Sequence, residues 1–318
     1  MTALRINLRK GGLLLTVLLL TGCALLPRQR TLAFDPFLPA SIELTQTPFF
    51  PQTDYQCGPA ALATLLVASG ANVTPEALSH QVYLPARKGS LQLELIAASR
   101  RQDRIPYLLE PNLHALMSEV AAQHPVMVLQ NLGLDWMPIW HYAVVIGFNQ
   151  QNSSIILRSG SEKRQQLPLA IFLHTWERAD HWAMVALPPD QLPITANENQ
   201  FLSAVQSLES MKRFSITAKA YQKAVERWPK SLGAWIGLGN SLYALQNFAE
   251  AETAFTTATE LHPNSVIAFN NLADTLAMQD KREAALIAAQ RAVALGGTTQ
   301  EKDIARRTLE QILQQLHR

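Results

Sequence analysis

Residues 51–62 read Pro-Gln-Thr-Asp-Tyr-Gln-Cys-Gly-Pro-Ala-Ala-Leu, and an apolar run continues from them to Gly70. Pro59 suits a first helical turn and Gly70 a helix end, so this run is predicted to form a helix that begins near Cys57. A thiol at a helix start lies among unpaired backbone N–H groups, which stabilise the thiolate and lower the thiol pKa. The stretch therefore marks Cys57 as a candidate nucleophile.

A candidate base lies about eighty residues further on, where residues 141–145 read His-Tyr-Ala-Val-Val. His141 opens the most apolar predicted strand and follows a loop that contains Trp136 and Trp140, so its ring is expected at a strand end beside a cleft. The backbone N–H of Cys57 and a nearby Gln amide could together bind an oxyanion. This combination indicates acyl transfer by a cysteine nucleophile.

In order and spacing, these two motifs resemble the papain-like, double-glycine leader peptidases that process bacteriocins. The resemblance covers residues 49–187 and implies an α+β papain-like cysteine peptidase domain. It also implies roles for three side chains in a thioester mechanism: Cys57 as nucleophile, His141 as general base and acid, and Gln52 in the oxyanion hole.

The spacing of the predicted oxyanion residue departs from the family pattern. The family usually places its Gln six residues before the Cys, whereas Gln52 lies five residues before Cys57. Either the loop between them is one residue shorter, or another group fills the role. Gln56 is the competing side chain, although a residue directly next to Cys57 is poorly oriented to donate to an oxyanion at that thiol.

The third member of the family's catalytic triad also differs. The family has an Asp on the strand after the His, and Ser159 takes that place here. A Ser hydroxyl can accept the imidazole N–H bond and fix the tautomer, but it brings no charge to stabilise an imidazolium. Asn149 and Asn152, in the turn before this strand, are the alternatives for orienting His141.

Further helices and strands are predicted within the same half of the chain. Helix starts are indicated at Thr74, Ser90 and Asn112. Four strand-like runs follow, at residues 125–132, 141–148, 154–159 and 181–187. Helices first and strands afterwards is an α+β order.

The C-terminal part of the chain repeats with a period of 34 residues, the spacing between Pro229 and Pro263. Large and small apolar residues recur in the pattern of the tetratricopeptide repeat, for example Trp235, Leu238 and Gly239. The pattern predicts an all-α superhelix. Such stacked repeats either serve stability alone, by burying each other's apolar faces, or form a concave surface that binds a peptide or protein partner. Its parts are a linker at 188–197, repeats at 198–231, 232–265 and 266–299, and a capping helix at 300–318.

The N-terminus is predicted to be a lipoprotein signal peptide. Basic residues precede a short apolar run from Gly11 to Leu20, and Leu-Thr-Gly-Cys follows at residues 20–23. That tetrapeptide resembles a bacterial lipobox, which implies removal of residues 1–22 and lipidation of Cys23. Because residue 24 is Ala rather than Asp, the resemblance implies the periplasmic face of the outer membrane, with residues 23–48 as the tether.

Composition narrows the set of partners. The chain has 318 residues, with 27 Lys plus Arg against 25 Asp plus Glu, and 7% aromatic residues, which argues against nucleic acid. There is no phosphate-binding glycine loop, and no histidine pairs with a carboxylate at metal-ligand spacing. We expect a peptide or protein substrate, a protein partner for the repeats, and membrane contact through the Cys23 lipid. No nucleotide, cofactor or metal is expected.

Three functions remain open at this point. The first is a lipid-anchored envelope cysteine peptidase, favoured by Cys57, His141 and Gln52. The second is a non-catalytic scaffold lipoprotein, favoured by Ser159 in place of Asp, and the third is a Cys-dependent acyltransferase. If Cys57 and His141 form an ion pair, iodoacetamide should still alkylate the thiol rapidly well below a pH of about 8.5.

Overall fold

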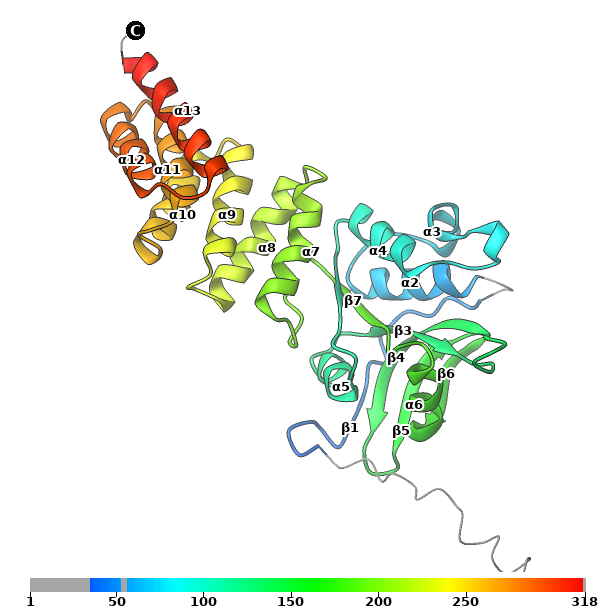
Figure 1. Cartoon of the computed structure of the whole chain (residues 1–318). Coiled ribbons are helices and arrows are strands. Elements are labelled where there is room, and N and C mark those ends of the chain that lie inside the picture. The colour runs from blue at the N-terminus through cyan, green and yellow to red at the C-terminus, as the bar shows by residue number, and fades with distance from the viewer. Residues whose placement is uncertain (1–34, 53–55, 317–318) are drawn as a thin grey trace, which may run out of the picture. The chain divides into compact units, whose positions relative to one another are not determined.

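The computed structural model describes residues 35–52 and 56–316 (Figure 1). The predicted signal peptide, Cys23 and the first part of the predicted tether lie outside the described residues. One compact unit begins at Pro36. Within the described ranges, no helix is both long and apolar enough to cross a membrane.

Seven strands form one sheet in which every neighbouring pair is antiparallel. The order is β2-β7-β3-β4-β5-β6, and β1 also pairs with β4. The strands are β1 (Ser41–Glu43), β2 (Ile105–Leu108), β3 (Val126–Asn131), β4 (Trp140–Asn149), β5 (Ser154–Ser159), β6 (Glu162–Pro168) and β7 (Ala183–Leu187). Every residue of β3, β5 and β7 is buried, which explains why each contains a run of consecutive apolar residues rather than an alternating pattern.

The four predicted strand runs are confirmed as β3, β4, β5 and β7. Two strands were not predicted, for local reasons. β6 is a mostly exposed edge strand that reads Glu-Lys-Arg-Gln-Gln-Leu-Pro, and so carries no apolar pattern. β2 contains a proline. The short strand β1 agrees with the sequence of residues 24–48, which is that expected for a tether followed by an entry strand.

Five α-helices and one short 3₁₀ helix surround this sheet, and Figure 1 shows α2, α3 and α4 gathered beside it. They are α2 (Cys57–Ala68), α3 (Pro75–Val82), η2 (Pro85–Arg87), α4 (Gln92–Arg101), α5 (Leu113–Ala121) and α6 (Leu169–Glu177). The side chains of Thr74 and Asn112 cap α3 and α5 as their sequences predict. The third predicted helix begins at Gln92 rather than next to Ser90.

The predicted order of helices before strands is wrong in detail, although the α+β class holds. β2 lies between α4 and α5, and α6 lies between β6 and β7. The buried residues Leu169, Phe172 and Trp176 recur at spacings of three and four along α6, a helical period that a search for strands overlooks.

The C-terminal part consists of paired helices that follow the 34-residue period. They are α7 (Glu198–Glu209), α8 (Phe214–Arg227), α9 (Leu232–Ala244), α10 (Phe248–Leu261), α11 (Val266–Met278), α12 (Arg282–Leu295) and α13 (Thr299–Leu316). A Cβ atom on Gly237 would lie 2.4 Å from the Tyr221 ring, and one on Gly239 would lie 2.4 Å from the Phe255 ring. The small residues of the repeat therefore admit aromatic rings from the neighbouring helices.

Candidate active site

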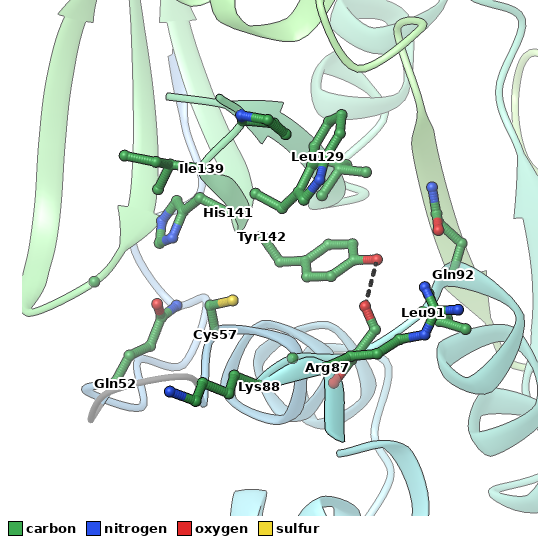
Figure 2. Close-up of a pocket in the computed structure, with 15 residues that line it drawn as sticks. Gln52, Cys57, Arg87, Lys88, Leu91, Gln92, Leu129, Ile139, His141 and Tyr142 are labelled. Carbon is green, nitrogen blue, oxygen red and sulfur yellow. Dashed lines mark hydrogen bonds between the residues drawn. The ribbon is translucent and has the colours of Figure 1, made fainter. Parts of the chain in front are cut away.

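A cavity of about 850 Å³ lies where the start of α2 faces the start of β4. Cys57, His141 and Gln52 all line it, although they are separated by up to 89 residues in the chain. Figure 2 shows His141 facing Cys57 and Gln52 at one end of this cavity. The structure thus brings together the three side chains that the sequence singles out.

Cys57 is the first residue of α2, which begins without a side-chain cap. The helix packs against β4, so its N-terminal end points toward the strand that carries His141. Gly58 permits close packing below the thiol, because a Cβ atom there would lie 2.4 Å from the Ser90 hydroxyl oxygen. The segment that contains Ser90 is fixed in turn by the Tyr142 hydroxyl, which donates to the Ser90 carbonyl at 3.3 Å.

His141 lies near the beginning of β4, and its Nε2 atom shares a hydrogen bond of 2.9 Å with Ser159 Oγ on β5. Ser159 is buried. The two asparagines weighed as alternatives lie elsewhere, since Asn149 ends β4 at about 27 Å of strand length from His141. The Asn149 side chain accepts from the N–H groups of Gln151 and Asn152 within that distant turn.

The two glutamines near Cys57 have different surroundings. Gln52 lines the cavity, and its backbone N–H donates to the Gly160 carbonyl at 3.1 Å, directly after Ser159. Gln56 instead lines a separate hollow with Pro51 and other residues. Of the two, only Gln52 has a side chain positioned to approach a group bound next to Cys57.

A buried arginine supports this part of the site in a role that its neighbours in the sequence do not predict. Arg158 lies next to Ser159, and its guanidinium donates to the backbone carbonyls of Thr45, Thr47 and Lys163. These bonds join the segment that leads to Gln52 to strand β5. Because five guanidinium N–H groups can bind several carbonyls at once, this residue type suits the position.

Burial changes the acid–base properties of the pair. Desolvation raises the pKa of the Cys57 thiol above its usual value, and this effect outweighs the opposing hydrogen bonds from the N–H groups of Tyr142, Gly58 and Cys57 itself. Desolvation likewise lowers the pKa of His141. The prediction that the helix start lowers the thiol pKa is therefore wrong, because burial has the larger effect. Both shifts favour the neutral thiol and the neutral imidazole over the ion pair.

These directions predict the pH dependence of Cys57 alkylation. A thiol whose pKa lies above about 8.5 is mostly protonated at pH 7, so its thiolate fraction should increase about tenfold per pH unit. We expect the iodoacetamide rate, read by intact mass, to rise through pH 8 without a plateau between pH 6 and 7. A plateau there would instead indicate a resting thiolate–imidazolium pair.

Within the described ranges, no group of three or more His, Cys, Asp or Glu side chains could hold a metal ion. The cavity also contains residues that the sequence did not single out, among them Arg87 and Ile139. The signal that could have found Ile139 is the apolar run between the strands β3 and β4, from Leu132 to Ile139.

Comparison with known proteins gives independent information on both halves of the chain. Residues 44–184 match the Peptidase_C39 like family, and residues 202–251 and 236–298 match the tetratricopeptide repeat. A search of the curated proteins found no match.

Among solved structures, a C39-like peptidase from Bacillus anthracis is 17% identical and covers 47% of this chain and 98% of its own, with a TM-score of 0.40. The Sgt2 TPR domain from Aspergillus fumigatus is 17% identical, covers 38% of this chain and 79% of its own, and has a TM-score of 0.35. The type III secretion translocator chaperone SycD from Yersinia enterocolitica is 15% identical and covers 38% and 86%, with a TM-score of 0.36. By its family matches and its fold, the chain consists of a C39-peptidase-like α+β domain followed by tetratricopeptide repeats.

Proposed function

We propose that the protein is a cysteine peptidase that cleaves a peptide bond at Cys57. The observation that carries this proposal is the shared cavity, in which Cys57, His141 and Gln52 meet and His141 is held by Ser159. A peptidase-like fold is common to active and inactive proteins, so the argument rests on the side chains rather than on the fold.

The hydrogen bond to Ser159 determines which ring nitrogen of His141 can act as the base. When Nε2–H donates to Ser159 Oγ, Nδ1 carries a lone pair and can accept the Cys57 proton. Since burial raises the pKa of Cys57 and lowers that of His141, both shifts favour a proton transfer that accompanies attack on the substrate carbonyl.

The attack forms a C–S bond and a tetrahedral oxyanion. The Cys57 backbone N–H and the Gln52 side-chain amide are proposed to donate to that oxyanion. His141 then gives its proton to the leaving amine as the C–N bond breaks, which leaves a thioester on Cys57. Water, deprotonated by His141, hydrolyses the thioester and regenerates the free thiol.

The repeats support protein–protein interaction, and a hollow of about 760 Å³ lies among residues of α7, α8, α9 and α11. We propose that they hold a protein partner or the substrate chain of the peptidase. We also propose that lipid on Cys23 anchors the protein at the periplasmic face of the outer membrane. The lipobox resemblance supports that anchor.

The test uses residues 24–318, which retain the whole compact unit and have Cys57 as their single cysteine. The protein is treated with a peptidyl vinyl sulfone at pH 7.5, and covalent mass is followed over time. We expect one adduct, none in Cys57→Ala, and a rate at least about 100-fold lower in His141→Ala. His174→Ala, which removes an exposed histidine on α6, is the matched control and should label normally.

Two outcomes would contradict the peptidase proposal, provided that circular dichroism shows intact folding. If no adduct forms, the domain is a binding module rather than a peptidase. If His141→Ala labels as fast as the unmodified chain, His141 is not the base. With a peptide ester as substrate, transfer of the acyl group from the Cys57 thioester to an added amine, in preference to water, would instead identify an acyltransferase.

A further inference from the structure

A hairpin beside the cavity exposes an unusual amount of apolar surface. Residues 132–140, called here the apolar hairpin, connect β3 to β4. Six of these nine residues are large, hydrophobic and exposed: Leu132 (49%), Leu134 (48%), Trp136 (77%), Met137 (54%), Ile139 (57%) and Trp140 (52%). Contiguous exposed apolar patches on soluble proteins commonly mark binding surfaces.

The apolar hairpin is held in one conformation by the side chain of buried Asn131. Its Oδ1 accepts from the N–H groups of Gly133 and Ile139 at 3.0 and 2.9 Å, and its Nδ2 donates to the Leu134 carbonyl at 3.4 Å. Backbone bonds between Leu134 and Met137 close the tip. A surface fixed in advance loses less conformational entropy when it binds a partner.

The hairpin continues directly into the cavity. Pro138, Ile139 and Trp140 line the cavity together with Cys57 and His141. Leu91 and Leu129 extend the apolar lining inward. A chain that brings a carbonyl to the Cys57 thiol therefore also passes along the hairpin's apolar side chains.

A second, basic surface borders the same cavity. Residues 85–88, called here the basic turn, comprise η2 and Lys88, and both Arg87 and Lys88 are exposed cavity-lining residues. Figure 2 shows Ile139 beyond His141, and Arg87 and Lys88 on the side of Cys57. The cavity is thus bordered by apolar side chains on one side and by cations on the other.

We propose that this cavity selects an extended peptide segment that carries a bulky apolar residue on one side of the scissile bond and an acidic residue near it. The apolar residue would pack on Ile139 and Trp140, and the acidic residue would face Arg87. This inference rests on the proposed peptidase function and adds its substrate class.

A lipid surface is the competing occupant of an exposed apolar hairpin. The exposed carboxylate of Asp135 lies at the hairpin tip, between Leu134 and Trp136, and a charged side chain is costly to bury in hydrocarbon. The continuity between hairpin and cavity favours a peptide. Binding of the apolar hairpin to a membrane is the alternative that the experiment must distinguish.

The experiment digests a proteome-derived peptide library with residues 24–318 and reads both sides of each cleaved bond by mass spectrometry. We expect enrichment of large apolar residues at one fixed position and of Asp or Glu at another. The best sequence is then made as a quenched fluorescent peptide, together with versions in which the apolar residue is Ser or the acidic residue is Lys.

Variants assign the two preferences to the two surfaces. Ile139→Ser and Trp140→Ser should each lower kcat/KM for the apolar peptide about tenfold and change the Ser peptide little. Arg87→Glu should make the Lys peptide a better substrate than the acidic peptide. The ratio of their kcat/KM values should change by about tenfold at low salt and by less at high salt. Ile171→Ser and Arg306→Glu, on α6 and α13, are matched exposed controls that should behave like the unmodified chain.

The outcomes separate this inference from the peptidase proposal. Suppose that Cys57 reacts with the vinyl sulfone in a His141-dependent way, but that no peptide is cleaved or the cleaved peptides lack either preference. The proposed substrate class is then wrong, while Cys57 remains the nucleophile. If Cys57 does not react at all, both the peptidase proposal and this inference are wrong. If Ile139→Ser and Trp140→Ser cleave normally but lose binding to phosphatidylglycerol vesicles, the hairpin binds a membrane and the inference is overturned.

Discussion

Replacing Ser159 with valine is expected to lower the rate of Cys57 acylation by a peptidyl electrophile about 10- to 100-fold. Valine has no hydroxyl and offers no acceptor to His141 Nε2, so the ring loses the contact that fixes its tautomer. The measurement is the second-order labelling rate at pH 7.5. Thr175→Val, which removes another hydroxyl of the same domain from its bond with Gln130, is the control.

Replacing Ser159 with aspartate should act in the opposite direction and alter the pH profile. A carboxylate beside the ring stabilises the imidazolium, so it raises the pKa of His141, which burial otherwise lowers. An imidazolium facing Cys57 then favours the thiolate and lowers the thiol pKa. Iodoacetamide alkylation of Ser159→Asp should therefore be faster than that of the unmodified chain at pH 6 to 7.

The two Ser159 variants are informative as a pair. If Ser159→Val and the unmodified chain acylate at the same rate, the hydroxyl is a packing group and does not position His141. If Ser159→Asp leaves the alkylation profile unchanged at low pH, the new carboxylate is protonated or does not reach the ring. In that case an aspartate at position 159 would give no more activation of Cys57 than the serine does.

The elements of the site that could be predicted from sequence are those that local motifs encode. Cys57 begins a helix because Pro59 suits its first turn, and His141 begins a strand because an apolar run follows it. Ser159 could be placed near His141 because the family resemblance puts the third triad residue on the strand after the His, and that strand, β5, pairs with β4. Each of these inferences depends on only a few adjacent residues.

The properties that could not be predicted depend on residues brought together by folding. The pKa of Cys57 is determined by how completely β4 and the segment around Ser90 enclose the thiol, and this burial cannot be read from the residues beside it. The role of Arg158 depends on carbonyls more than a hundred positions away in the chain. The edge strand β6 has no apolar pattern because half of its environment is solvent.

Buried Glu119 on α5 leads to a prediction about stability that is independent of the cavity. Its side chain is fully buried, and Oε2 lies 2.7 Å from His124 Nδ1. Its Oε1 accepts from both the N–H and the hydroxyl of Thr195, at 2.8 and 2.6 Å. One carboxylate thus joins α5 to the segment that follows β7, within the predicted linker.

Glu119→Ala is expected to lower the free energy of unfolding by about 3 to 5 kcal/mol, because it leaves partly buried donors on Thr195 and His124 without an acceptor. Glu119→Gln retains the Oε1 acceptor for Thr195 and should cost about 1 to 2 kcal/mol. Glu177→Ala, an exposed glutamate on α6, should stay within about 0.5 kcal/mol of the unmodified chain. Urea denaturation at pH 7 measures all three. A loss for Glu119→Ala no larger than that for Glu177→Ala would mean that water satisfies the released groups and that this carboxylate does not hold the segment in place.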